Sequence, residues 1–372
     1  IPHKGQGVPR ETPSRNSIAD LRTCLAGHFP DVSWGELRKE LERREFFAAA
    51  MQQQVRILAE ASAAIVGERH KVAALIPALA SSPAEKVRGV AAFLVPLAYP
   101  DDLTGQLQSL RYTGGLEGTW PRELSATLLH NLVIQHGVAT ILPLVQGWIA
   151  DAQPAIRRLV VESFRPRGVM LAHIVELKED PSPLRLILEP LLDDESDYVR
   201  KAVANNLNDI SRDNPEVVLD WAGEWNAPDA SEERRWILTR ALRTLVNRGE
   251  PAALAILGYA PPTSLDVTWL DTTPATVGIN QLLPFEFQIS NRSETSAHVL
   301  LLLTMDAPGK GSARRTSRYH LWTGLVGAGQ AVSASKRVHF VDKSTQRKES
   351  GTYRLIVTVN GEVVEERTTT FL

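Results

Sequence analysis

Cysteine is almost missing from this sequence, which has one, Cys24, among 372 residues. A single cysteine excludes a disulfide within the chain and any zinc site built from several cysteines. Long apolar runs are also missing, since none approaches the roughly 20 residues of a membrane-spanning helix. The polar first segment, "IPHKGQGVPRETPSRNS", has no hydrophobic signal core. These absences favour a cytoplasmic protein with no membrane partner.

Strong net charge and cofactor motifs are missing too. Lys and Arg total 41 against 43 Asp and Glu, which gives a net charge of −2 at pH 7. This balance weighs mildly against a nucleic-acid binder, although a basic patch can lie on a neutral protein. The glycines of "RYTGGLEG" at 111–118 lack the Lys-Ser/Thr of a P-loop and indicate a turn. We expect no cofactor and no bound metal.

The hydrophobic pattern divides the chain into two parts. Its composition, 43% hydrophobic and 23% charged, suggests a globular protein, and its length suggests two or more domains. The apolar residues follow the helical period up to about residue 258 and alternate as in strands after "GYAPPTSLD". Asn360-Gly361, between two alternating runs, predicts a β-hairpin. We expect a poorly ordered segment over 1–16, a helical domain over 17–258 and an all-β sandwich over 263–372.

The helical part repeats a pattern in which a polar or proline-containing turn precedes a short polar or basic patch and an apolar stripe. It occurs in "SPAEKVRGVAAFLVPLA", "TWPRELSATLLHNLV", "AQPAIRRLVVESFRPRG", "ESDYVRKAVANNLNDIS" and "SEERRWILTRALRTLVN". The irregular spacing is typical of HEAT-like helix pairs, whose second helices line a concave surface. Stacking the segments predicts one ladder of residues on that surface: Phe93, His130, Glu162, Asn205 and Arg243.

One of these segments has an unusual polar side. Val199, Val203, Leu207 and Ile210 have the spacing of a buried helical stripe. The residues turned away from this stripe are Lys201, Asn205, Asn208, Asp209 and Arg212. Asn and Asp are poor helix formers that compete for backbone hydrogen bonds, so an ordinary solvated face would avoid them. We interpret this side as one rung of a binding groove.

"YVRKAVANNLNDISRDNP" and "IRRLVVESFRPRG" resemble the DNA alkylation repair glycosylases of the AlkC/AlkD superfamily, over roughly residues 80–250. The resemblance is closest to the AlkC branch that carries an immunoglobulin-like domain. It implies an α-helical HEAT-like solenoid followed by a small all-β immunoglobulin-like sandwich. It also implies a DNA glycosylase of base excision repair, which hydrolyses the N-glycosidic bond of cationic bases such as 3-methyladenine and 3-methylcytosine in duplex DNA. This family does not flip the lesion into a base pocket.

The chemistry of such a reaction explains why carboxylates are the candidate catalytic residues. A base alkylated at N3 already carries a positive charge, so it can leave as a neutral molecule without a general acid. The sugar that remains has oxocarbenium character, and a nearby carboxylate can stabilise it and orient a water. The candidates, in order of preference, are Glu162, Asp209, Glu123 and Trp120.

Each candidate also has a structural alternative. Glu162 could be a solvated helix glutamate, and Asp209, which shares a face with Asn205 and Asn208, could cap a neighbouring turn. Trp120, next to a proline in the first helical turn, could be a packing residue. His130 lies on the predicted ladder, although a lone helical histidine is more often structural.

Basic and amide side chains suggest a track for the DNA backbone, because free N–H groups and arginines at helix N-termini bind phosphates. Singly, each basic residue could be a surface residue or belong to an intrahelical ion pair. The predicted DNA contacts in the helical part are His130, Arg157, Arg158, Arg165, Arg167, Arg200, Lys201, Asn205, Asn208, Arg234, Arg235 and Arg243. In the β part they are Lys310, Arg314, Arg315 and Arg318, in a loop that could reach the minor groove or simply be solvated.

The expected partner is therefore double-stranded DNA with alkylated bases, bound by a monomer. The competing hypothesis is a HEAT-repeat scaffold that binds DNA or protein without catalysis. Only the enzyme needs the carboxylates of Glu162 and Asp209, whereas both proteins could use the basic residues.

Overall fold

The computed structural model describes residues 14–30, 32–168, 171–259, 261–270, 274–278, 281–308, 314–339 and 349–372. The chain divides into two compact units, of which the first ends at Ile210 and the second extends from Ser211 to Leu372. No helix in the described ranges is long and apolar enough to cross a membrane.

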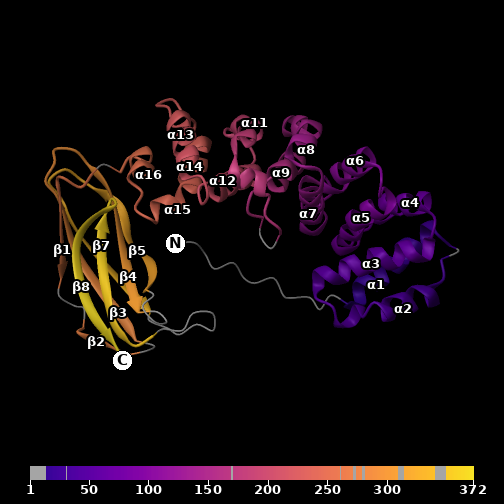
Figure 1. Ribbon diagram of the computed structural model, residues 1–372, viewed down its shortest axis with the longest axis horizontal. Helices are drawn as coiled ribbons and strands as arrows, with labels where there is room; N and C mark the ends of the chain where they lie inside the picture. Colours follow the sequence, from indigo (N-terminus) through magenta and orange to yellow (C-terminus); the bar gives the residue numbers. More distant parts are fainter. Residues whose placement is uncertain are drawn as a thin grey trace. The chain divides into compact units, whose positions relative to one another are not determined.

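In its described residues the first unit is built from helices alone (Figure 1). Its α-helices are α1 (Ser14–His28), α2 (Trp34–Arg43), α3 (Met51–Val66), α4 (Arg69–Ala80), α5 (Glu85–Ala98), α6 (Leu103–Gly114), α7 (Thr119–His136), α8 (Val138–Val145), α9 (Pro154–Ser163), α10 (Val175–Glu179), α11 (Arg185–Leu188) and α12 (Asp197–Ile210). Short 3₁₀ turns join them: η1 (Phe46–Ala48), η2 (Gln146–Ala150), η3 (Ser182–Leu184) and η4 (Glu189–Leu191).

Four helices of this unit, α5, α7, α9 and α12, pack one against the next in a row, with α4, α6 and α8 packed beside them (Figure 1). They correspond to the first four repeated segments of the sequence. The predicted stripe of α12 is confirmed, because Val199, Val203, Leu207 and Ile210 are at most 1% exposed. Burying each such side chain contributes about 1.5–3 kcal/mol, which fixes the side of α12 that faces the core.

The polar side of α12 is less exposed than a solvated face would be. Asn206 and Asn208 are buried, and Asp209 is nearly so. Asn206 donates through Nδ2 to the carbonyl of Val161 on α9, at 2.9 Å. The unusual amides of this helix therefore serve packing between two rungs as well as the surface.

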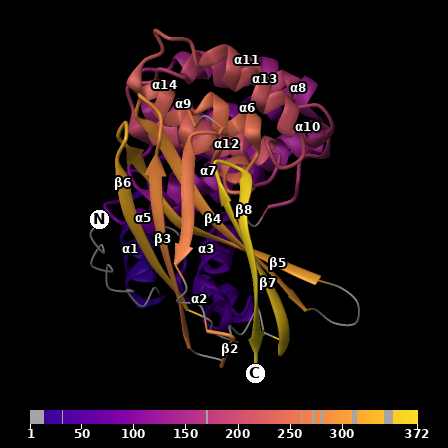
Figure 2. The ribbon, with the colours of Figure 1, turned by 90° about the vertical axis from the view of Figure 1, so that its left-hand side faces the viewer.

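The second unit begins with helices α13 (Pro215–Trp225), α14 (Glu232–Ala241), α15 (Arg243–Val246) and α16 (Pro251–Ile256). Its strands are β1 (Leu265–Leu270), β2 (Thr276–Val277), β3 (Leu282–Asn291), β4 (Ala297–Pro308), β5 (Arg314–Val326), β6 (Ala331–His339), β7 (Gly351–Val359) and β8 (Glu362–Phe371). They form a sheet of order β1-β3-β6 and a sheet of order β2-β8-β7-β4-β5, antiparallel except for the β2–β8 pair (Figure 2).

The two sheets share one apolar core, to which Phe285 and Phe287 of β3 and Leu303 of β4 contribute. The hairpin predicted at Asn360-Gly361 is confirmed between β7 and β8. Both turn residues have positive φ, 47° and 89°, as an Asn-Gly hairpin turn requires. These features confirm the predicted change from helices to an all-β sandwich.

Helix α16 of the second unit packs onto the larger sheet. Leu254 of α16 shares a small core with Leu300 and Leu302 of β4. A Cβ added at Gly361 would lie 2.6 Å from the carbonyl oxygen of Gly249, so glycine is needed for this approach. The change from helix to strand falls between Ile256 and Leu265, but α13–α16 share a compact unit with the sheets.

Candidate active site and nucleic-acid interface

Five charged side chains of alternating sign lie together where α7, α9 and α12 pack. An Oε1 of Glu123 is 3.6 Å from Nη2 of Arg158, and the same Nη2 is 2.9 Å from Oε1 of Glu162. Arg165 donates from Nη1 to Oε2 of Glu162 at 3.0 Å and from Nη2 to Oδ2 of Asp209 at 2.6 Å. We call these five residues the carboxylate–arginine cluster.

The local sequence explains how three helices supply this cluster. Pro154 opens α9, and Arg158 and Glu162 follow at i and i+4, on one face of the helix. Arg165 comes just after the helix ends, where the chain is free to turn its guanidinium back towards Glu162. Asp209 belongs to the last turn of α12, which packs on α9. The meeting of Arg165 with Asp209 depends on this packing.

The inner part of the cluster is largely shielded from water. The side chains of Glu162 and Arg165 are 12% and 13% exposed, and that of Asp209 is 6% exposed. Burial alone would lower the pKa of Arg165, but the carboxylates of Glu162 and Asp209 outweigh it and raise this pKa above its ordinary value. Arg165 is therefore a permanent cation between two carboxylates.

Arg158 is fixed from a second direction. Its Cζ lies 4.1 Å from the ring centroid of Tyr198, and its Nη1 donates to the carbonyl of Tyr198 at 2.9 Å. Its contact with Oε1 of Glu162 is an ion pair without hydrogen-bond geometry, so this buried oxygen has no hydrogen-bond partner among the described residues. Glu162 thus has one oxygen held by Arg165 and one whose hydrogen-bonding capacity is unused.

A cavity of about 170 Å³ opens beside the cluster. Its lining comes from α7, α9, the segment after α9, and α12: Glu123, Ala126, Thr127, Arg158, Glu162, Arg165, Gly168, Leu171 and Asn205. Five of the predicted site residues line this one cavity: Glu123, Arg158, Glu162, Arg165 and Asn205. Asp209 adjoins it through Arg165.

Two predicted site residues lie elsewhere. Trp120 does not line the cavity: a Cβ at Gly89 of α5 would meet its Cβ at 3.2 Å, and its backbone N–H donates to Glu85 at 2.8 Å. This is the packing position that the sequence left open as the alternative. Asn208, predicted to contact DNA, is fully buried, so that contact is incompatible with the structure.

His130 was also predicted to contact DNA, and the structure contradicts this. The residue is 0% exposed. Its Nδ1 lies 2.9 Å from the carbonyl oxygen of Ser163, and its Nε2 lies 2.8 Å from that of Ala172. Because backbone carbonyls engage both ring nitrogens, the ring has no free edge for a phosphate.

The arginines at the helix openings share a repeated structural contact. In successive repeats an arginine of the first helical turns donates to carbonyls of the turn before its own helix. The pairs are Arg88 with Ser82 and Pro83, Arg122 with Leu116, Arg157 with Asp151 and Ala152, Arg200 with Asp194 and Glu195, and Arg235 with Pro228. Arg157, Arg200 and Arg235, which the sequence predicts to contact DNA, thus also make contacts within the chain.

Arg157 is the most enclosed of these arginines. It donates from Nε and Nη2 to the two carboxylate oxygens of Asp194, at 2.7 and 2.8 Å. Its pKa is raised above the ordinary value, mainly by these hydrogen bonds. A guanidinium used in this way cannot also bind a phosphate.

This repeated contact also corrects the predicted ladder. Counting five residues on from each capping arginine gives Phe93, Thr127, Glu162, Asn205 and Arg240. Thr127, Glu162 and Asn205 all line the cavity, whereas His130 and Arg243 lie three residues further on. Apolar periodicity alone therefore left the register of these two helices uncertain by about one helical turn. The recurring arginine in the sequence is the signal that could have fixed it.

The remaining predicted DNA contacts are surface or half-buried groups. Lys201 pairs with Asp197, and Arg243 donates to the carbonyl of Arg240. Arg167 and Arg234 are half-buried. In the sandwich, Arg314 pairs with Asp306, and Arg315 and Arg318 are exposed on β5, while Lys310 lies outside the described residues.

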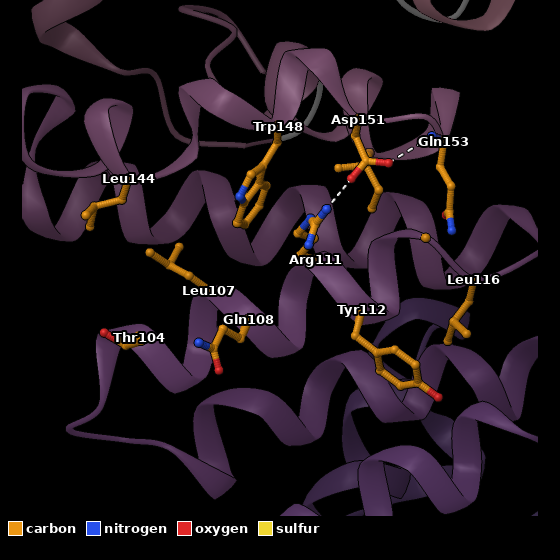
Figure 3. Close-up of a pocket in the computed structure, with 12 residues that line it drawn as sticks. Thr104, Leu107, Gln108, Arg111, Tyr112, Leu116, Leu144, Trp148, Asp151 and Gln153 are labelled. Carbon is orange, nitrogen blue, oxygen red and sulfur yellow. Dashed lines mark hydrogen bonds and ion pairs between the residues drawn. The ribbon is translucent and has the colours of Figure 1, made fainter.

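A larger cavity, of about 630 Å³, lies away from the cluster, between α6, η2 and the start of α9 (Figure 3). Figure 3 shows Arg111 reaching towards Asp151, with which it pairs, beside the ring of Trp148. Leu107, Leu116 and Leu144 belong to the apolar part of its wall. Cavity size therefore does not mark the candidate site, and the arrangement of charge does. Within the described ranges no three His, Cys, Asp or Glu residues lie close enough to hold a metal ion.

Comparison with known proteins gives the class of this molecule. The family model described as DNA alkylation repair enzyme matches residues 26–245. A second model, described as the C-terminal immunoglobulin-like domain of the uncharacterised protein YhaZ, matches residues 266–371. The first match covers more than half of the chain, which therefore belongs to the DNA alkylation repair enzyme family.

Two particular proteins are similar to it. The uncharacterized protein YhaZ of Bacillus subtilis (strain 168) is 34% identical over 217 residues, which are 58% of this chain and 60% of that protein. The alkylpurine DNA glycosylase AlkC of Pseudomonas fluorescens, solved bound to DNA containing an abasic site analog, matches with a TM-score of 0.82 at 21% identity. That match covers 96% of this chain and 97% of AlkC. The predicted fold class, a helical array followed by an immunoglobulin-like domain, is confirmed, as is the resemblance to the AlkC branch.

Proposed function

We propose that this protein is a DNA glycosylase that hydrolyses the N-glycosidic bond of cationic alkylated bases, 3-methyladenine and 3-methylcytosine, in duplex DNA. The observation that carries the proposal is Glu162, a shielded carboxylate at the edge of a small cavity with one oxygen oriented by Arg165. Membership in the DNA alkylation repair enzyme family and a fold shared with AlkC support it.

The reaction can be written with this carboxylate and a water molecule. The bond between C1′ and the base nitrogen breaks, and its electron pair neutralises the cationic base, which leaves without an added proton. The sugar becomes an oxocarbenium-like cation, and the Glu162 carboxylate stabilises it. Water then adds to C1′ and gives its proton to a carboxylate, which releases it to solvent.

The structure supports different roles for the two predicted carboxylates. Glu162 lines the cavity, whereas Asp209 reaches it only through Arg165. We assign the contact with the sugar to Glu162, and we assign to Asp209 the orientation of Arg165. Glu123, 51% exposed at the outer end of the cluster, fits a contact with solvent or the DNA backbone better than a catalytic role.

The small cavity supports excision without base flipping. None of the residues that line it is aromatic, whereas pockets that hold a flipped base stack it between aromatic or apolar side chains. We therefore expect bulky N3 adducts to be tolerated better than by glycosylases with an enclosing pocket. Uracil, a neutral base, should remain in the DNA because no acid here is assigned to protonate it. Efficient uracil release would contradict this mechanism.

The decisive experiment is release of 3-methyladenine from methylated duplex DNA by the purified protein and by Glu162→Gln. Glu195→Gln is the matched control, since Glu195 is 86% exposed and lies outside the cavity lining. The proposal expects release by the wild type and the control, and strongly reduced release by Glu162→Gln. A wild type that binds the duplex but releases no alkylated base would instead favour the non-catalytic scaffold.

A further inference from the structure

The buried His130 bridges two backbone segments that border the candidate site. One is the last turn of α9, where the carbonyl oxygen of Ser163 lies 2.9 Å from Nδ1. The other is the chain after α9, where the carbonyl oxygen of Ala172 lies 2.8 Å from Nε2. Arg165 lies between these two anchoring points.

Each ring nitrogen lies within hydrogen-bond distance of a backbone carbonyl oxygen, so the planar imidazole links the two segments through both of its polar edges. Ser163 is the last residue of α9, so this link fixes the point at which the chain leaves the helix towards Arg165.

The ring is packed as well as hydrogen-bonded. A Cβ added at Gly168 would lie 3.4 Å from Cε1 of His130 and 3.0 Å from Cβ of Leu171. Gly168 and Leu171 both line the cavity, and the N–H of Ile174 donates to the carbonyl of Pro166 at 3.2 Å, which closes the segment. The ring is therefore held by two backbone carbonyls and approached closely by Gly168.

We propose that His130 is a positioning residue that ties the end of α9 to the segment around Ala172 and so fixes Arg165 against Glu162 and Asp209. This inference rests on the proposed function for its effect on excision. The geometric part, the placing of Arg165, does not depend on any activity.

The first test uses the intact wild-type protein with ¹⁵N-labelled histidine. NMR should show a ring N–H of His130 that hydrogen bonds to a backbone carbonyl and is protected from exchange with water. His136, exposed near the end of the same helix, is the internal reference and should exchange freely. A ring N–H of His130 that exchanges as fast as that of His136 would overturn the proposal, and no variant has to fold for this result.

The second test is a double-mutant cycle on excision. His130→Gln should lower the single-turnover rate by roughly 10-fold to 100-fold, because small misplacement of a site group is costly, with a much smaller change in DNA affinity. In an Arg165→Ala background the same substitution should change the rate by less than about twofold, because the guanidinium through which His130 acts is absent. Equal losses in both backgrounds would show that His130 does not act through Arg165. His136→Gln should be without effect.

A third readout separates this inference from the proposed function. The Nε–H of Arg165 donates to Asp209 at 2.8 Å, and its NMR signal should be protected from exchange in the wild type and exposed in His130→Gln. Should the wild type release no base at all, the proposed function fails while this signal still reports the coupling. An Arg165 signal unchanged by His130→Gln would overturn the positioning role.

Discussion

Two ionic networks meet on α9, and they differ in where their hydrogen bonds end. Arg157 directs its donors to Asp194 and to carbonyls of the preceding turn. Arg158, the next residue, holds Glu162 and stacks on Tyr198 beside a cavity. The first network closes on the chain itself, whereas the second leaves a buried oxygen of Glu162 without a hydrogen-bond partner among the described residues. A buried carboxylate oxygen that lacks a hydrogen-bond partner and lies beside a cavity distinguishes the candidate site from its supporting structure.

The largest effect expected from this comparison is on stability. Arg157→Ala removes the partner of the buried carboxylate of Asp194, and breaking such a pair costs about 3–5 kcal/mol. The free energy of unfolding, measured by urea denaturation, should fall by this amount. Excision per folded molecule should change little. A selective loss of excision at wild-type stability would place Arg157 in the site after all.

Glu162→Gln should show the reverse pattern, in which the main effect is on excision. The substitution keeps the shape and removes the charge, so excision should fall by roughly 10² or more, which corresponds to a few kcal/mol of transition-state stabilisation. Affinity for duplex DNA with an abasic site analogue should change little. Single-turnover kinetics at saturating enzyme measure the first quantity, and fluorescence anisotropy measures the second. Excision at the wild-type rate would exclude Glu162 as the catalytic carboxylate.

Arg165→Ala, compared with Arg111→Ala, sharpens the contrast between a site arginine and a surface one. Arg165 is 13% exposed between two carboxylates, while Arg111 is 52% exposed in its pair with Asp151. Loss of Arg165 should lower excision by roughly tenfold or more, because Glu162 loses the group that orients it. Arg111→Ala should leave excision unchanged. Equal behaviour of the two variants in the same assay would contradict the assignment of the cluster.

The raised pKa of Arg165 also predicts how this contrast depends on pH. A raised pKa in the folded state contributes stability that is present below the unfolded-state value and lost only as the pH rises through the folded value. For an arginine both values are strongly alkaline. The stability difference between wild type and Arg165→Ala should therefore stay constant between about pH 6 and 9. Denaturation curves across this range provide the measurement, and a decline of the difference towards pH 9 would count against a permanent cation.

The smallest effect concerns the sandwich. If Arg314 and Arg315 bind phosphates, replacing both by Ala should reduce the slope of log K against log salt by about one unit for each phosphate that is no longer neutralised. Damaged and undamaged duplexes should be affected alike, and the single-turnover rate at saturation should not change. Point variants are preferable to deletion of the sandwich, because α16 packs on β4. An unchanged slope would exclude phosphate binding at these two positions.

The predictions for α7 and α12 show what hydrophobic periodicity alone can determine. The apolar stripe of α12 follows from spacing alone, since burial of Val199 and Val203 requires no knowledge of the partner helix. The same reasoning left α7 undecided by one turn, so that His130 was predicted on the surface where Thr127 lies. An apolar stripe determines which side of a helix is buried. Whether a residue at the edge of the stripe is buried or exposed depends on its contacts with neighbouring segments.

The sequence by itself determined the change from helices to strands, the hairpin at Asn360-Gly361, the repeated helices and the choice of Glu162 as the candidate carboxylate. Each of these depends on a local pattern of apolar residues, on turn chemistry or on a short motif. Only the tertiary structure decided that Arg157 binds carbonyls while Arg158 faces a cavity, and that Asp209 meets Arg165 from another helix. The physical reason is that an ionised side chain takes its role from its partner, and these partners are supplied by the packing of distant segments.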